Sequence, residues 1–394
     1  MKINSTILAA ALGLGSVSLA SATQYVYYTG STAARDAVYN TIINGSAVFD
    51  ATPTFVGYGS ATAGNCSQME FTGAIGGNAT IIKCAWSGSE AGILDVSGSG
   101  TESFLADPGQ NGVATSGANS ASATSGQLSD VEVVDIAQAD NAKSYSNTPG
   151  SGATEIPDEL AIPFVFVKSQ NTLADNSLFT DITSANSQNL AAGGELLAVY
   201  TGNPADVNNF VYLAGRDNNS GTRVNTFDIT GWGSKHVCAQ IEMGQVGSTP
   251  ANGQMIEFGS PLAYQGNGGQ SSGGTLAKSF GDTTSSVDQV NGGTGFIAVA
   301  YLGLSDAATA ENSTYNAVQL TYNGVPETVA NVENGLYALW GNEYTEIRAG
   351  APTIATTVAN KIVAHIQANT TGFEIPFSSM NVSRTGPTAV PTHN

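Results

Sequence analysis

Positively charged residues are scarce in this chain of 394 residues. It has 12 Lys and Arg against 31 Asp and Glu, which gives a formal net charge of −19. Nucleic-acid binding needs clustered cations that replace the counterions of the phosphates, and an anionic membrane surface would repel the chain. The composition therefore excludes nucleic acid and anionic membranes as partners.

Cysteine and histidine are also rare, with three residues of each kind. There is no Cys-x-x-Cys pair and the histidines are isolated, so we expect no metal site and no cofactor. In an exported chain, Cys66 and Cys84 form a plausible disulfide. This pairing would leave Cys238 outside the bridge and buried.

Long apolar runs are missing as well, because no segment reaches the ~18 continuous apolar residues that a transmembrane helix requires. The N-terminus has Lys2, then the short apolar run 7–14, then Ala20-Ser21-Ala22. This order is typical of a secretory signal peptide, here residues 1–22. No Cys follows the cleavage position, so a lipid anchor is not expected. We predict a periplasmic or secreted protein.

What is present is a pattern of strand, small polar turn and helix, which occurs three times. The three copies cover 25–43, 80–96 and 210–227. Strands that alternate with helices favour α/β layers. Helices that begin after Ser, Thr and Gly offer free backbone N–H groups and hydroxyls, which suit an anion.

The third turn, Arg216–Thr222, carries the most chemistry. A guanidinium at the end of a strand can hold an oxyanion through two parallel hydrogen bonds. Ser220 and Thr222 add hydroxyls, and Gly221 lets the backbone approach a ligand closely. The alternative interpretation is an ordinary capped turn with a surface arginine, because turns often contain Ser-Gly-Thr.

The turns at 30–32 and 87–89 are weaker signals, since helix caps of this composition are common. Asp140 adds a carboxylate to the set. Among converging donors, an acid helps only if the ligand has a proton to donate. The combination suits hydrogen phosphate and disfavours an anion like sulfate. The alternative for Asp140 is a turn or helix-cap residue.

Several segments resemble, in order, those of the phosphate-binding periplasmic solute-binding proteins of ABC importers. The resemblance spans most of the chain after the signal peptide, and Arg-x-x-x-Ser-Gly-Thr at 216–222 is its most specific element. Two departures are Ala139, where the family usually has Ser, and Asn218, where it often has an acid. The matching segments are 28–34, 87–93, 134–140, 162–167, 216–222, 295–301, 323–328 and 334–337.

The resemblance implies a two-lobed α/β fold of the type II periplasmic-binding-protein kind, with two crossovers forming a hinge. Lobe one would comprise 23–162 plus 296–394, and lobe two 163–295. Residues 98–130 would be a low-complexity insertion in lobe one. The residues implied to face the ligand are Ser31, Thr32, Ser89 and Asp140 from lobe one, and Arg216, Ser220, Gly221 and Thr222 from lobe two.

The implied function is the capture of inorganic phosphate by a monomer that docks on an ABC permease and ATPase complex, with no enzymatic step. Two alternatives stay open. One is a secreted surface or adhesive protein, which the Gly/Ser/Asn/Thr-rich loops would suit. The other is a binding protein for molybdate or sulfate. A Gly-x-Ser-x-Gly match at 269–273 lies in a low-complexity loop, without a plausible His partner, and does not favour a hydrolase.

Overall fold

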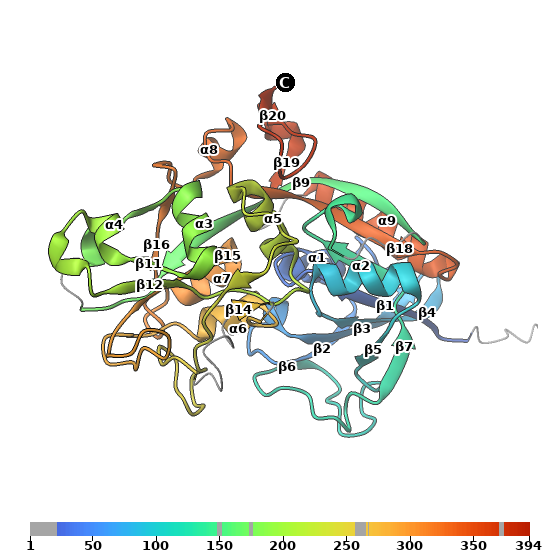
Figure 1. Ribbon diagram of the computed structural model, residues 1–394. Coiled ribbons are helices and arrows are strands. Elements are labelled where there is room, and N and C mark those ends of the chain that lie inside the picture. Colours follow the sequence, from blue (N-terminus) through green and yellow to red (C-terminus); the bar gives the residue numbers. More distant parts are fainter. Residues whose placement is uncertain (1–21, 148–151, 173–175, 257–264, 267, 370–373) are drawn as a thin grey trace, which may run out of the picture.

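Long strands connect two α/β lobes in the computed structural model (Figure 1). The structure describes residues 22–147, 152–172, 176–256, 265–266, 268–369 and 374–394. The predicted signal peptide lies outside these ranges except for its last residue. Within them, no helix has the length and apolar character needed to cross a membrane.

The sheet of lobe one has both parallel and antiparallel neighbours. β1 pairs in parallel with β4 and β8, which brings the ends of the first predicted strand and of the Asp140 segment together. In spatial order, its strands are β6 (Gly117–Asn119), β2 (Thr54–Tyr58), β3 (Gln68–Ile75), β4 (Asn78–Ala85), β1 (Gln24–Gly30) and β8 (Ile136–Ala139).

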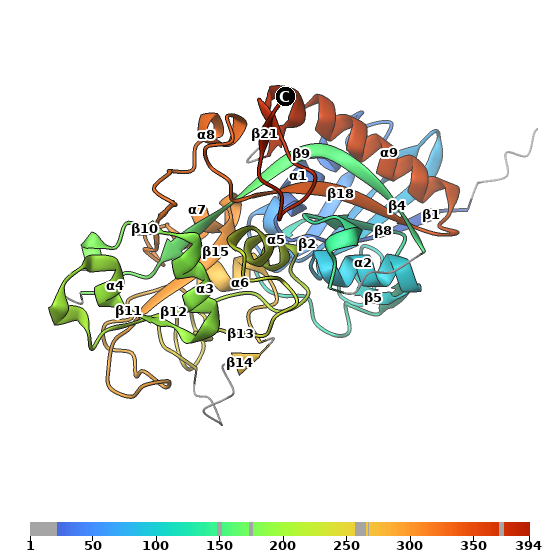
Figure 2. The ribbon, with the colours of Figure 1, turned by 45° about the horizontal axis from the view of Figure 1, so that its top comes forward.

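Two long strands cross between the lobes. β9 (Ala153–Lys168) pairs with β18 (Trp340–Arg348) through its first part and with β15 (Ile297–Gly303) through residues 164–168. β18 also pairs with β8, so the sheet runs continuously from one lobe to the other. β9 and β18 lie side by side across the molecule in Figure 2. This arrangement confirms the expected two-lobed α/β architecture with two crossovers.

The return to lobe one falls later in the chain than residue 296. β15 pairs with β12 (Phe210–Leu213), whose other neighbour is β11 (Glu195–Leu196), so β15 belongs to lobe two. The chain re-enters lobe one only at β18. A continuous apolar run such as 295–303 indicates a strand buried on both faces, but it does not say which sheet the strand joins.

Helices cover both lobes, and each lobe has its own apolar core. The predicted amphipathic helix near the end is α9 (Thr353–Ala368), which buries Val358, Ile362 and Ile366 against lobe one. The other helices are α1 (Arg35–Ile43) and α2 (Ser89–Gly98) in lobe one, and α3 (Ser184–Gly193), α4 (Leu197–Thr201), α5 (Gly221–Thr230), α6 (Gly273–Lys278), α7 (Leu304–Ala310) and α8 (Val329–Glu333) in lobe two.

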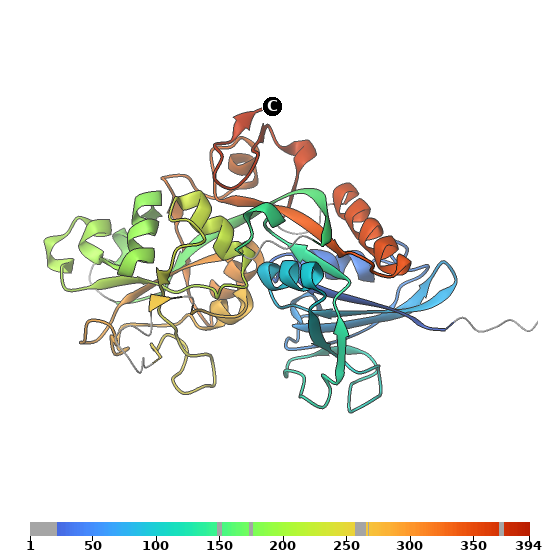
Figure 3. The same ribbon diagram turned by 45° about the vertical axis from the view of Figure 1, so that its right-hand side comes forward.

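Short strands complete the description. They are β10 (Asp181–Ile182) with β17 (Thr321–Tyr322), β13 (Cys238–Ala239) with β14 (Gln265–Gly266), β20 (Val382–Ser383) with β21 (Thr392–His393), and β16 (Val318–Gln319) and β19 (Ile375–Pro376), which both pair with β9. Figure 3 shows the green and yellow helices of lobe two on one side and the blue and cyan strands of lobe one on the other.

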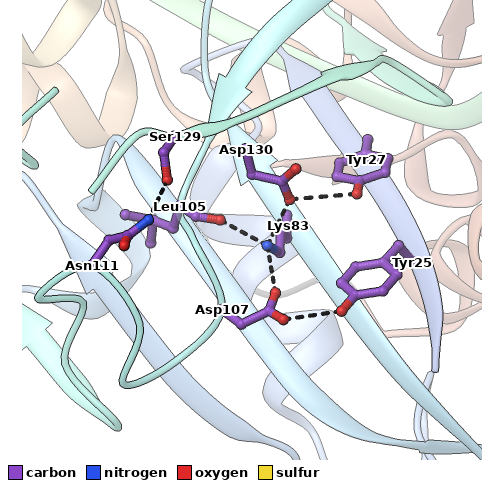
Figure 4. Close-up of polar contacts among 8 residues, drawn as sticks. All are labelled: Tyr25, Tyr27, Lys83, Leu105, Asp107, Asn111, Ser129 and Asp130. Atoms are coloured by element: carbon purple, nitrogen blue, oxygen red, sulfur yellow. Dashed lines mark hydrogen bonds and ion pairs between the residues drawn. The ribbon is translucent and has the colours of Figure 1, made fainter. Parts of the chain in front are cut away.

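Residues 98–130, the predicted insertion, are folded onto lobe one, where β5 (Thr101–Phe104) pairs with β7 (Asp130–Val133). Lys83 of β4 holds this segment through two hydrogen bonds from Nζ, 2.8 Å to the Leu105 carbonyl and 2.7 Å to Asp130 Oδ2, and through an ion pair with Asp107 Oδ1 at 2.8 Å. Figure 4 shows these contacts, together with the Tyr25 and Tyr27 hydroxyls that donate to the same two carboxylates. We call Lys83, Asp107, Asp130, Tyr25 and Tyr27 the Lys83 cluster.

The expected disulfide between Cys66 and Cys84 is not formed, and both residues are buried free thiols. In the pairing of β3 with β4, the residue opposite Cys84 is Met69, three positions after Cys66. The Cys66 thiol is directed instead to the Ser60 carbonyl, at 3.4 Å. The cysteine count suggested a bridge, whereas the strand register decides which side chains meet.

Candidate functional site

Asp140 lies where the two lobes meet, directly after β8. Its Oδ1 accepts a hydrogen bond from the Ser89 hydroxyl at the start of α2, and its Oδ2 accepts one from the Thr222 hydroxyl in α5 at 2.9 Å. Its main-chain carbonyl accepts from the Asn225 side-chain amide. All three side chains, Asp140, Ser89 and Thr222, are nearly inaccessible to solvent. One carboxylate therefore joins hydroxyls from both lobes.

Gly221, the first residue of α5, makes this approach possible. A Cβ at this position would lie under 3.0 Å from the side-chain oxygens of Asp140, Asn141 and Ser89. Nearby, the Glu90 N–H of lobe one donates to the Asn219 carbonyl of lobe two at 2.9 Å. The lobes are thus in direct contact here. We call Ser89, Asp140, Gly221 and Thr222 the Asp140 cluster.

The Ser31 and Ser220 hydroxyls are both used locally, Ser31 in the turn before α1 and Ser220 as the N-cap of α5. Ser31 Oγ accepts from the Ala33 and Ala34 N–H groups at 3.1 and 3.3 Å. Ser220 Oγ accepts from the Arg223 N–H at 3.2 Å. The Ser220 bond is the one that an N-cap hydroxyl normally makes, whereas α1 has no side-chain cap. Both residues are buried close to the lobe junction, but their hydroxyls make no contact with Asp140 in the part of the chain that the structure describes.

Arg216 is buried, with 2% of its surface exposed, so the interpretation as a surface arginine is wrong. Its Nε donates to the Gln270 carbonyl and its Nη2 to the Ser271 carbonyl, each at 3.1 Å. The Gly273 N–H, at the start of α6, lies 3.5 Å from Thr32 Oγ1 of lobe one. Among the described residues, no hydrogen bond connects the Arg216 guanidinium with the Asp140 cluster. The predicted site residues therefore form two neighbouring groups.

Sequence reasoning missed two charged residues beside Arg216. A Cβ at Gly273 would lie against Asp306 Oδ2 and 3.4 Å from Arg216 Nη1. A Cβ at Gly274 would lie 3.5 Å from Asp306 Oδ1 and 3.8 Å from Arg35 Nη2. Asp306 therefore sits between two buried guanidinium groups. We call Arg35, Arg216 and Asp306 the Arg35 cluster.

Electrostatics in the Arg35 cluster work in opposing directions. Burial raises the pKa of the Asp306 carboxyl, although Arg35 and Arg216 favour its charged form. Burial also lowers the pKa of Arg35, an effect that Asp306 opposes and Arg216 reinforces. A signal for Arg35 was present in the sequence, because it is one of only five arginines and occupies the apolar stripe of Val38 and Ile42. Asp306 gave no comparable signal.

Several acidic side chains lie near Asp140 and the strand β18. Glu343 of β18 is fully buried, and its two carboxyl oxygens have no hydrogen-bond partner among the described residues. Burial raises its pKa well above the usual range, and the nearby carboxylates of Glu374, Asp158 and Asp140 add to the effect.

Within the described ranges, no group of three or more His, Cys, Asp or Glu residues is arranged to hold a metal ion.

Comparisons with known proteins gave matches only among solved structures. No family model matches the chain, and no curated protein sequence matches it significantly. A candidate phosphate ABC transporter substrate-binding protein from Clostridium perfringens, solved with bound phosphate, is 12% identical, with a TM-score of 0.47 over 86% of this chain and 93% of that chain.

Two further structures are similar over comparable lengths. PstS from Borrelia burgdorferi is 13% identical, with a TM-score of 0.37 over 86% of this chain and 92% of that chain. An ABC-type phosphate transport receptor from Vibrio cholerae is 12% identical, with a TM-score of 0.40 over 87% and 95%. All three TM-scores lie below 0.5, so the functional proposal rests on this chain's own residues.

Proposed function

We propose that this chain is an exported solute-binding protein that captures hydrogen phosphate between its two lobes. The observation that carries the proposal is the Asp140 cluster, in which one buried carboxylate meets hydroxyls from both lobes. Ser89 and Thr222 also stand at the starts of α2 and α5, where backbone N–H groups have no partner within the helix. The set offers two hydroxyls and backbone N–H groups as donors, and one carboxylate that can only accept.

This combination selects the protonation state of the ligand. The unprotonated oxygens of phosphate would accept hydrogen bonds from the Ser89 and Thr222 hydroxyls and from N–H groups at the starts of the two helices. The protonated oxygen would donate to Asp140. Sulfate has no proton to donate at neutral pH, so its oxygen would face the Asp140 carboxylate without a hydrogen bond. We therefore expect sulfate to be rejected.

Binding would be coupled to the relative position of the lobes. Ser89 belongs to lobe one and Thr222 to lobe two, and the hydroxyls of both now bond to Asp140. A phosphate that takes these two hydroxyls would hold the same two surfaces together. The account includes no covalent step. We propose that the closed form, a monomer, delivers phosphate to an ABC permease and ATPase complex.

Isothermal titration with phosphate, sulfate and molybdate tests the proposal. We expect saturable heat with phosphate, much weaker binding of sulfate, and a loss of phosphate affinity of more than tenfold in Ser89→Ala. Asp282→Asn, which changes an exposed acid of lobe two, is the control and should bind as the wild type does. No heat with any of the three anions would contradict the proposal and favour a surface or adhesive protein. Tighter binding of molybdate or sulfate would assign a different oxyanion.

A further inference from the structure

A polar cleft opens between the lobes beside the Arg35 cluster. It has a volume of about 490 Å³ and is lined from both lobes. Arg35 of α1 reaches it from lobe one, and Lys278 of α6 and Asp306 of α7 reach it from lobe two. In Figure 1, α1, α6 and α7 lie near the junction of the lobes. The Asp140 cluster does not contribute to this lining.

Arg35 is the unusual member of the cleft. Its side chain is buried, with 5% of the residue exposed, yet its Nε has no hydrogen-bond partner. Among the described residues, its guanidinium makes no hydrogen bond and no ion pair within 4.0 Å. A buried charge without hydrogen bonds is costly, and Arg side chains are almost always paired when buried. The fold therefore holds a desolvated donor at the wall of an open cleft.

The charge of the cleft is opposite to that of the whole chain. Arg35 and Lys278 face one acid, Asp306, and Arg216 lies behind Asp306. Lys278 makes no ion pair in the part of the chain that the structure describes. The chain has only 12 Lys and Arg in 394 residues, so two that line one cleft are a marked concentration. This local excess of positive charge suits an anionic group.

The remaining lining is made of hydroxyls and amides. The cleft volume is in the range of small-molecule sites, far above the size of a single oxyanion. Hydroxyls and amides can bond to the hydroxyl groups of a ligand as both donors and acceptors. Representative lining residues are Ser60, Thr62 and Asn65 from lobe one, and Ser272, Thr275 and Asn312 from lobe two.

We propose that this cleft is a separate binding site for a small organic anion, a hydroxylated molecule that carries one carboxylate or phosphate group. The anionic group binds the Arg35 guanidinium, and Lys278 adds a second positive charge. The hydroxyl groups of the ligand bond to the polar walls of both lobes. No residue is shared between this cleft and the Asp140 cluster.

Calorimetric titration with gluconate and with glucose 6-phosphate tests the site, on the wild type and on Ser89→Ala, in which the Asp140 cluster is impaired and this cleft is unchanged. Gluconate carries a carboxylate and glucose 6-phosphate a phosphate, so the two titrations distinguish the anionic groups. We expect at least one to bind the wild type and glucose, which has no charge, not to bind. Arg35→Met should lower the affinity for the probe that binds more than tenfold, and Lys278→Ala should lower it about threefold to tenfold.

Lys235→Ala is the matched control, because Lys235 is an exposed cation of lobe two that does not line this cleft. It should bind the probe as the wild type does. Lys278→Ala, at a half-buried position, decides the outcome if Arg35→Met does not fold. The proposal is overturned if neither probe binds, if glucose binds as tightly as the charged probes, or if removal of the cleft cation leaves the affinity unchanged.

Discussion

Two groups of buried charged side chains in this molecule differ in how their hydrogen bonds are satisfied. In the Lys83 cluster, the three Nζ donors of one cation all meet acceptors within lobe one. In the Arg35 cluster, two guanidinium groups share one neighbouring acid, and Arg35 Nε has no partner among the described residues. The members of the Arg35 cluster are also divided between the lobes.

This difference separates a structural role from a binding role. A fully bonded buried cation fixes the segments that carry its partners, and here it fixes the segment 98–130 on β4. A cation that keeps unused donors at a cleft has free energy to gain from an added anion. The Asp140 cluster combines both properties. Its carboxylate is fully bonded, but the hydroxyls of Ser89 and Thr222 that bond it would donate to a ligand instead when one binds.

The largest effect is expected for Lys83→Met. The change leaves the Asp107 and Asp130 carboxylates without their cation and releases the insertion from the sheet. Breaking a buried ion pair by removing one partner costs ~3–5 kcal/mol. Since both carboxylates are partly exposed, we expect the free energy of unfolding to fall by about 3 kcal/mol, measured by urea denaturation.

Lys361→Met is the control for this change. Lys361 is half-buried and bonds a carbonyl, that of Val48, rather than a carboxylate. We expect a loss of about 1 kcal/mol or less. Equal losses for the two variants would remove the distinction between a cation in a buried network and an ordinary lysine.

Gly221→Ala should act on the contact between the lobes rather than on either lobe alone. The added methyl would collide with the oxygens of Asp140, Asn141 and Ser89. We expect the lobes to separate, which would increase the radius of gyration in small-angle X-ray scattering, and phosphate affinity to fall by about 100-fold, or ~2.7 kcal/mol. Gly98→Ala, where an added methyl meets nothing within 4 Å, should change neither quantity.

Glu70, a neighbour of the Lys83 cluster, should make the free energy of unfolding depend on pH. It lies opposite Lys83 in the pairing of β3 with β4, and burial raises its pKa to about 8 despite the attraction of Lys83. A carboxyl whose pKa is raised in the folded state stabilises the fold while it is protonated, and this stability is lost as pH rises through about 8. Burial also raises the pKa of Glu346 to about 8, and Glu155 adds to this effect.

We therefore expect the free energy of unfolding to decrease from pH 7 to pH 9, by about 1 kcal/mol for each of these two acids. Glu70→Gln should remove its share of the decrease and leave that of Glu346. Urea denaturation at a series of pH values measures both. A decrease that is as large in Glu70→Gln as in the wild type would show that Glu70 is already ionised in the folded protein at pH 7.

Arg35→Met should have the smallest effect on stability, and of the opposite sign to Lys83→Met. Replacing an unpaired buried charge with an apolar side chain of similar length relieves its desolvation cost. We expect the free energy of unfolding to rise by about 0.5 kcal/mol. A loss of about 2 kcal/mol or more would mean that Arg35 stabilises the fold as Lys83 does, and the contrast between the two clusters would disappear.

The sequence predicted local structure better than it predicted which side chains meet. The turns before α1, α2 and α5 were recognisable because a small polar segment separates a β-type run from helical spacing. The proximity of Arg35 and Asp306 was not predictable, since the two residues are far apart in the chain and only the packing of the lobes brings them together. The return to lobe one at β18 depended on strand pairing in the same way.

The candidate site likewise contains residues whose proximity was expected and one residue whose contacts were not. Asp140, Ser89, Gly221 and Thr222 were all expected at the ligand, and they do lie together in the structure. Arg216 was expected with them, but its guanidinium bonds the loop at 270–271, which the sequence presented only as a low-complexity segment. A segment of Gly, Ser and Gln carries no periodicity that would place it next to an arginine.

The selectivity between phosphate and sulfate tests the central claim most directly. Titration calorimetry at pH 7 on the wild type and on Asp140→Asn gives the ratio of the two affinities. We predict that the wild type prefers phosphate by at least 100-fold, and that Asp140→Asn reduces the preference below tenfold by replacing an obligate acceptor with an amide that can also donate. A wild type that binds both anions equally, or a variant that keeps the full preference, would contradict the account.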